Sequence, residues 1–281
     1  MKLLGSIFLV IALSASGQVV GQTEERLPDG EFATISVNGM QISAWYGSPT
    51  TRYRHGILGD AIEAGSLHLR IGDRDVQSFH LPKTEVFEDR TPRLVDLNGD
   101  GSIEIITIRS YLDAGGSVAI FGLQNGKLAE LASSKSVGRA NRWLNIAGIA
   151  DYAGTGSSQI AYVETPHIGG TLYFLEWRGS ELVPIASMPR FSNHKIGSRE
   201  QALTSSLDFT GNGKPDLVVP SDNLRALRIV GFEDGALKEF KRIKLPASVL
   251  KSQSGSAENQ QCATFKMTNG QTLEICPVGD R

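Results

Sequence analysis

The sequence predicts an all-β protein, arranged like a β-propeller with four to five blades of four antiparallel strands each. Three observations predict it. A loop rich in Asp and Gly recurs about every 55 residues, and a second hairpin recurs in step with it. Gly also makes up 31 of the 281 residues, above the usual ~7%. Four short strands in each repeat of this length are typical of a propeller blade, and the alternative is an open β-sandwich.

The chain begins like an exported protein. Lys2 is followed by an apolar run from Leu3 to Leu13 and then by small residues, the three-part layout of a secretory signal peptide. We expect residues 1–21 to be this leader and 22–281 to form a single propeller domain. The apolar run is too short to span about 30 Å of hydrocarbon, so the sequence indicates a periplasmic or secreted protein without a membrane span in its mature form.

The first recurring unit is a D-x-x-G-x-G loop followed by a β-rich run. Its three copies start 55 and then 57 residues apart, at Asp96–Ile106, Asp151–Ala161 and Asp208–Val218. Apolar residues precede each copy, so each loop is expected to join two strands of one hairpin.

The second unit is a hairpin with a Gly-containing turn. It recurs at 116–128, 170–182 and 224–237, with a looser copy at 65–76. The inner strand of each repeat is expected just before the Asp loop, at 93–97, 144–149 and 202–207. Pairing of Phe32–Val37 with the C-terminal hairpin would close the ring and remove its exposed edges.

Both cysteines lie near the C-terminus. Two alternating stretches surround Asn269-Gly270, and Asn-Gly is the strongest short hairpin signal. Cys262 and Cys276 are each seven residues from Asn269, so the hairpin would place them opposite each other. In an oxidising compartment this spacing predicts a disulfide; a metal or catalytic pair is the alternative.

The run D-x-N-x-D-G-x-x-E at 96–104 resembles the FG-GAP/VCBS repeat of integrin-like β-propellers, which also occur in exported bacterial proteins. The resemblance covers about residues 88–245 in three copies. It implies a propeller whose Asp-rich loops can bind calcium. The family includes adhesion, binding and enzyme-linked proteins, so the resemblance indicates fold more than function.

Calcium prefers oxygen ligands from alternating residues of a tight loop. The first loop offers such a set, with the carbonyl oxygen of Ser102 among its members: Asp96, Asn98, Asp100, Ser102 and Glu104. The second loop keeps one carboxylate, and the third carries Lys214 at its centre. Only the first loop is therefore expected to hold a structural calcium ion; the alternative is that all three are turns stabilised by Asp side chains.

Composition and motifs bear on function. The formal charge of -2 gives no electrostatic reason to expect a nucleic-acid partner. The chain has no G-x-S-x-G, no H-E-x-x-H and no Gly-rich phosphate loop, and the expected inner strands carry almost no acids. The sequence thus favours a non-enzymatic binding protein, with an unknown small ligand, carbohydrate or protein as its partner. The alternative is a hydrolase or lyase that acts on a polysaccharide or other polymer in the propeller channel.

The loops that precede the second hairpins, together with the connections between repeats, should gather on one face of a propeller. They contain five residues suited to an acidic or sugar-like ligand: Arg139, Arg142, Trp143, His167 and Asp113. We interpret these five residues as a candidate ligand pocket; the alternative is a solvated polar rim.

Overall fold

The computed structural model describes residues 25–257 and 260–277. Within these ranges every regular element is a β-strand, so the all-β prediction is confirmed. They contain no helix long and apolar enough to cross a membrane. The expected signal peptide, residues 1–21, lies outside the described residues.

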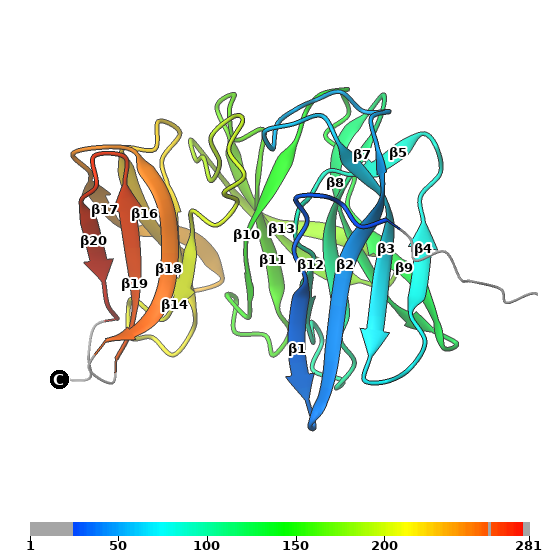
Figure 1. The fold of residues 1–281 in the computed structure, drawn as a ribbon. Helices are drawn as coiled ribbons and strands as arrows, with labels where there is room; N and C mark the ends of the chain where they lie inside the picture. Colours follow the sequence, from blue (N-terminus) through cyan, green and yellow to red (C-terminus); the bar gives the residue numbers. More distant parts are fainter. Residues whose placement is uncertain (1–24, 258–259, 278–281) are drawn as a thin grey trace, which may run out of the picture.

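The strands follow one another as five antiparallel meanders (Figure 1). The first meander contains β1 (Ala33–Val37), β2 (Met40–Thr50), β3 (Glu63–Ile71) and β4 (Gln77–His80). The second contains β6 (Arg93–Val95), β7 (Glu104–Tyr111), β8 (Gly115–Gln124) and β9 (Lys127–Ser133). The third contains β10 (Leu144–Ala150), β11 (Gln159–Glu164), β12 (Thr171–Arg178) and β13 (Glu181–Pro189).

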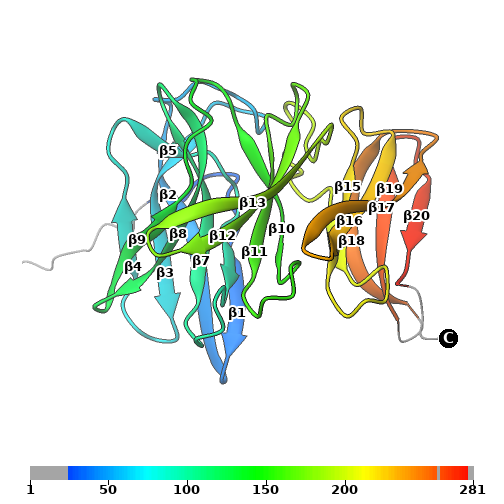
Figure 2. The same cartoon turned by 180° about the vertical axis from the view of Figure 1, so that it is seen from behind.

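The last two meanders lie side by side, apart from the N-terminal strands (Figure 1). The fourth contains β14 (Ser205–Leu207), β15 (Asp216–Pro220), β16 (Ala226–Glu233) and β17 (Ala236–Lys244). Within the described residues the fifth contains three strands, where four were expected: β18 (Val249–Ala257), β19 (Gln260–Met267) and β20 (Thr272–Ile275). Seen from behind, β13 and β17 lie obliquely across the other strands of their meanders (Figure 2).

Two weak links merge the first three meanders into one curled sheet of thirteen strands. The short strand β5 (Glu85–Phe87) pairs with both β3 and β7, and β9 meets β13 through the single parallel pair Ser133 and Glu181. Among the described residues β1 pairs only with β2, and β20 only with β19. The expected closure of the ring through Phe32–Val37 is therefore absent, because β1 adds to the edge of its own hairpin.

Local sequence explains most of the strand boundaries. Each Asp/Gly loop joins the first two strands of the second, third and fourth meanders, as the repeats predicted. Two-residue turns such as Asn125-Gly126 and Asp234-Gly235 join the last two strands, and both residues of each turn have positive φ. These turns are the ones that the sequence marks with Asn-Gly or Asp-Gly.

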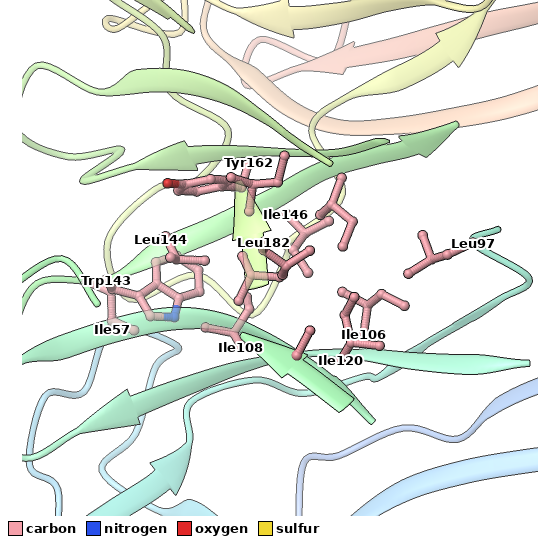
Figure 3. Close-up of a cluster of buried hydrophobic side chains, with 14 of the residues drawn as sticks. Ile57, Leu97, Ile106, Ile108, Ile120, Trp143, Leu144, Ile146, Tyr162 and Leu182 are labelled. Carbon is pink, nitrogen blue, oxygen red and sulfur yellow. The ribbon is translucent and has the colours of Figure 1, made fainter. Parts of the chain in front are cut away.

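Hydrophobic cores lie between consecutive meanders. One core joins the first meander to the second, and a second core joins the second to the third. Two more lie between the third and fourth and between the fourth and fifth. Figure 3 shows the core between the second and third meanders, where Ile106, Ile108 and Ile120 face Leu144 and Leu182. Each meander is thus stabilised by apolar area that it buries against its neighbours.

Candidate functional site

The loops between second and third strands lie at the same end of the molecule as the connections between meanders (upper end in Figure 1). We call this end the loop face and define it by residues 51–62, 112–114, 134–143, 165–170, 190–204 and 221–225. Backbone hydrogen bonds tie these loops together: Thr165 donates to Trp143, Gly197 to Ile57, and Asp222 to Arg190. The loop face is therefore a connected surface, as the repeat pattern predicted.

A buried polar and aromatic cluster lies beneath the loop face, centred on Trp143. This side chain is 2% exposed, and its indole N–H donates to the carbonyl of Glu88 at 2.9 Å. The His167 ring stacks on the indole with ring centroids 6.2 Å apart, and the His194 ring meets it edge-on at 4.8 Å. The indole is packed on several sides, so it contributes to stability rather than to an open ligand surface.

Two buried carboxyl groups belong to this cluster. Glu88 is fully buried; one of its oxygens contacts Nδ1 of His55 at 2.6 Å, and the other accepts from the Ser110 hydroxyl. Burial raises the pKa of Glu88, and burial together with the charge of Glu88 raises the pKa of Glu63 to about 10. Both effects favour the protonated form of the Glu63 carboxyl group.

The two histidines of the cluster form a neutral pair. His194 donates from Nε2 to the carbonyl of Ser198 at 2.8 Å, which leaves its Nδ1 to accept from Nε2 of His167 at 3.0 Å. Burial lowers the pKa of both histidines to about 4. At neutral pH this pair holds the 165–170 and 190–204 loops together without a net charge.

The five residues predicted as a ligand pocket divide into two groups. Trp143 and His167 come together, but inside the cluster. Arg139 and Asp113 are exposed in their loops, and Arg142 is half-buried with its guanidinium on the carbonyl of Asn141. None of the five lines one of the four cavities described for this structure, so the ligand pocket stays a prediction.

Glu63 and Glu88 could not be identified from the sequence as members of the cluster. Glu63 opens β3 and Glu88 directly follows β5, positions that look like ordinary strand ends in the sequence. The one available signal is Glu88-Asp89, two adjacent acids that follow the apolar pair Val86-Phe87.

The loop face exposes two large apolar side chains. Ile168 is 62% exposed and Ile196 is 64% exposed, more than any other large hydrophobic residue that the structure describes. Exposed cations occupy the same loops: Arg54, Arg139, Lys195 and Arg199. Apolar side chains surrounded by charged ones are typical of surfaces that bind another protein.

A cavity of about 660 Å³ lies between the first strands of the meanders and is lined by residues of β6, β10 and β18. Its two acids are both paired: Glu31 lies 3.4 Å from Arg90, and Glu200 lies 3.5 Å from Lys251. Arg199 also lines the cavity and forms ion pairs with Asp29 and Asp60. Each acid of the cavity is thus neutralised by a neighbouring cation, so neither Glu31 nor Glu200 is free for acid–base chemistry.

The Asp96 loop is held by its own side chains. The Asp96 carboxylate accepts from the backbone N–H groups of Gly99, Asp100 and Gly101, and Glu104 accepts from Leu97. Asp151 and Asp208 hold the other two loops in the same way. The same pattern of hydrogen bonds to the leading Asp therefore forms in the second loop, which has one carboxylate, and in the first loop, which has three.

The first loop carries oxygen donors of the kind that calcium prefers, but its three carboxylates are not among the described residues whose ligand atoms all lie within 4.8 Å of one another, so the calcium site stays a prediction. Asp100 is exposed, and the hydrogen bonds that its carboxylate accepts from the backbone N–H of Ser102 and from the Asn98 amide lower its pKa. Burial and the charges of Asp100 and Asp96 raise the pKa of Glu104. A divalent cation would offset this repulsion between carboxylates, and all the candidate ligands are oxygens.

Cys262 and Cys276 form a disulfide with Cα atoms 4.2 Å apart, so the predicted pairing is confirmed. A disulfide is compatible with an oxidising compartment.

No protein-family model matches the chain, and no curated protein matches it. The resemblance to FG-GAP/VCBS repeats therefore stays a prediction.

Proposed function

We propose that this chain is an exported, non-enzymatic binding protein with a five-bladed propeller arrangement, which binds a protein partner through its loop face. The exposure of Ile168 and Ile196 among cations on that face carries the proposal.

The propeller arrangement is supported by the order of the meanders. They follow one another along the chain, each pair of neighbours shares a hydrophobic core, and first strands of several meanders line one cavity. A radial arrangement accounts for all three features, because each blade of a propeller packs on the next around a central channel.

The chemistry of the loop face indicates the kind of partner. Ile168 and Ile196 offer apolar area whose contact with water is unfavourable until a partner covers it. Arg54, Arg139 and Lys195 are exposed in the surrounding loops, and Asp60 is already paired with Arg199. A partner surface with an apolar centre and an acidic border would complement both features.

A calcium ion in the Asp96 loop is part of the proposal, with a structural role. Asp96, Asn98, Asp100, the Ser102 carbonyl and Glu104 would hold it. The loop lies at the opposite end of its meander from the loop face, because β7 runs from Glu104 to Tyr111 between the two ends. The ion would therefore stabilise the loop rather than contact the partner.

The alternative, a hydrolase or lyase with its site in the channel, has less support. Such an enzyme needs convergent carboxylates or a histidine with a carboxylate partner that faces substrate. Glu31 and Glu200 in the cavity are paired with Arg90 and Lys251, and the pair His55 and Glu88 lies in the buried cluster.

Site-specific photocrosslinking in cells that export the protein tests the function. A benzophenone amino acid at position 168 or 196 should give a discrete adduct with a partner. The same amino acid at position 123 is the control, because Leu123 is 42% exposed but lies near the end of β8 away from the loop face. The double variant Arg139→Glu, Lys195→Glu should weaken the adduct at 168 and 196.

Equal adducts at 123 and 168, or none at 168 and 196, would contradict the proposed surface. An adduct that is unchanged by the double charge reversal would contradict an acidic border on the partner.

A further inference from the structure

A cleft of about 620 Å³ lies at the junction of the second and third meanders. One wall is formed by residues 133–136, at and just after the end of β9. The other is formed by the start of β13. Since β9 and β13 share only one residue pair, the rest of their lengths is not joined by hydrogen bonds. The cleft has a volume typical of sites that bind small molecules.

Two tyrosines form the floor of this cleft. Tyr162 and Tyr173 are cross-strand partners on β11 and β12, and their rings stack with centroids 5.3 Å apart and planes 17° apart. Tyr162 belongs to the core between the second and third meanders, and Figure 3 shows its hydroxyl pointing away from Ile146. Leu175 and Pro184 extend this apolar floor.

Three polar groups at the floor keep unused hydrogen-bonding capacity. Within the described residues the Glu164 carboxylate and the hydroxyls of Tyr162 and Tyr173 have no hydrogen-bond partner, although all three residues line the cleft. Burial raises the pKa of Glu164, and burial together with the nearby charge of Glu164 raises the pKa of both tyrosines. Tyr173 is the cross-strand partner of Tyr162, and Glu164 follows Tyr162 by two residues on the same strand, so the three groups lie close together on the cleft.

The charges around the cleft select the kind of ligand. Two acids, Glu164 and Glu181, line the cleft together with one cation, Lys135, so an anion would be repelled by both acids and a cation would meet Lys135. A neutral ligand with one apolar face and several hydroxyl groups meets neither penalty. It would also satisfy the carboxylate and the two phenols, which otherwise depend on water.

We propose that this cleft binds a neutral carbohydrate, with the apolar face of a pyranose ring on Tyr173 and ring hydroxyls on Glu164. Ser136 lines the same cleft and adds a further hydroxyl. Neither Ile168 nor Ile196 lines the cleft, although Ser134, Lys135 and Ser136 belong to both the cleft and the loop face. The inference concerns a different ligand and does not depend on the proposed protein partner.

Titration of the whole mature protein with neutral sugars tests the inference. Methyl glucoside, methyl galactoside, methyl mannoside, N-acetylglucosamine, maltose and cellobiose are compared by saturation-transfer NMR and calorimetry. At least one sugar should bind saturably. Tyr173→Ala and Glu164→Gln should each weaken it about tenfold or more, which corresponds to about 1.4 kcal/mol. Tyr173→Phe, which keeps the aromatic ring, should reduce the affinity for the sugar less than Tyr173→Ala does.

Tyr111→Ala is the matched control, because Tyr111 is a half-buried tyrosine at the end of β7 and does not line the cleft. It should leave the affinity unchanged. Absence of saturable binding for every sugar would overturn the inference. Equal affinities of the wild type and Tyr173→Ala would also overturn it, as would equally tight binding of glucosamine and glucuronate. None of these outcomes changes the crosslinking expected at Ile168.

Discussion

Gly115 is a position where the backbone tolerates no side chain. Its φ is +74°, and a Cβ atom there would lie 2.4 Å from the carbonyl oxygen of Arg139 and 2.5 Å from that of Arg142. The missing side chain lets the 134–143 loop pack directly on the start of β8. This contact fixes the loop that carries the exposed Arg139.

Gly115→Ala should therefore lower the free energy of unfolding by about 3 kcal/mol. The loss has two causes: an alanine is strained at this positive φ, and its Cβ atom would clash with two carbonyl oxygens. Gly126→Ala is the control, because Gly126 has a φ of +77° but a Cβ atom there would meet nothing within 4 Å. Gly126→Ala should lower the free energy of unfolding by only about 1 kcal/mol. Urea denaturation of both variants measures the difference, and equal losses would contradict the role of the close approach.

The pair of His167 and His194 links stability to pH. Both pKa values are lowered to about 4 in the folded protein, whereas an unfolded histidine has a pKa near its ordinary value of 6.5. Below about pH 6.5 the unfolded state therefore binds protons that the folded state does not. The stabilisation from these two groups is complete above that value and is lost as the pH falls towards 4.

His167→Gln should make this loss of stability smaller between pH 7.5 and pH 5, since one titrating group is removed. The glutamine amide can still donate to Nδ1 of His194. Glu63 and Glu88 are the same in both proteins, so the difference between the two pH dependences isolates the histidine. Urea denaturation at the two pH values gives the result, and an unchanged pH dependence would show that His167 titrates normally in the fold.

At the scale of elements, the three Asp loops share one backbone framework but differ in the side chains that close it. In the second loop Gln159 stands where Glu104 stands in the first, and it accepts from Ala153 and donates to Thr155 and Ser157. An uncharged amide thus closes the second loop. Glu104 accepts from Leu97 in the first loop much as Gln159 accepts from Ala153 in the second, so Asp100 is the carboxylate of the first loop that this framework does not need.

Excess calcium should raise the melting temperature of the protein, and a chelator should lower it, because an ion that binds only the folded state stabilises it. Asp100→Ala should remove this response. Asp151→Ala should lower the melting temperature itself, since Asp151 accepts from Thr155 and Gly156, but it should keep the calcium response. Calorimetric titration without heat, together with no thermal shift in millimolar calcium, would contradict the site.

Strands and turns could be predicted because their signals are local. The alternation of apolar residues and the Gly-containing turns (Asn-Gly in the second meander, Arg-Gly in the third, Asp-Gly in the fourth) indicated these hairpins, and Asn269-Gly270 indicated the position of the disulfide. The candidate site could be predicted only in part. Trp143 and His167 lie at the expected end of the molecule, but Trp143 is buried against Glu88, which follows β5 in the preceding connection. Such contacts between distant segments leave no periodic signal.

At the scale of the whole molecule, stability depends on shared cores. The core between the fourth and fifth meanders combines Val218, Leu227 and Ile229 with Phe265 and Met267. Phe265 is fully buried. Since each meander covers its neighbours, we expect the five to unfold together as one domain.

Phe265→Ala should lower the free energy of unfolding by about 3–5 kcal/mol. The three tryptophans lie in the first three meanders or their loops, at Trp45, Trp143 and Trp177, far along the chain from the change. If unfolding is cooperative, tryptophan fluorescence and circular dichroism should report the same shifted transition. A tryptophan transition that stays at the wild-type denaturant concentration would show that the C-terminal meanders unfold separately.

The three-stranded fifth meander has a consequence for self-association. Within the described residues β20 has one neighbour, β19, so it presents a free edge, and free edges are templates for strands of other molecules. The disulfide ties the end of β20 to β19 and keeps a four-residue strand, too short to be an effective template, at the rim. A reduced protein can release β20 and uncover the edge of the eight-residue β19 beside the core residue Phe265. Reductant should therefore make light scattering increase with protein concentration, whereas the oxidised protein should stay monodisperse.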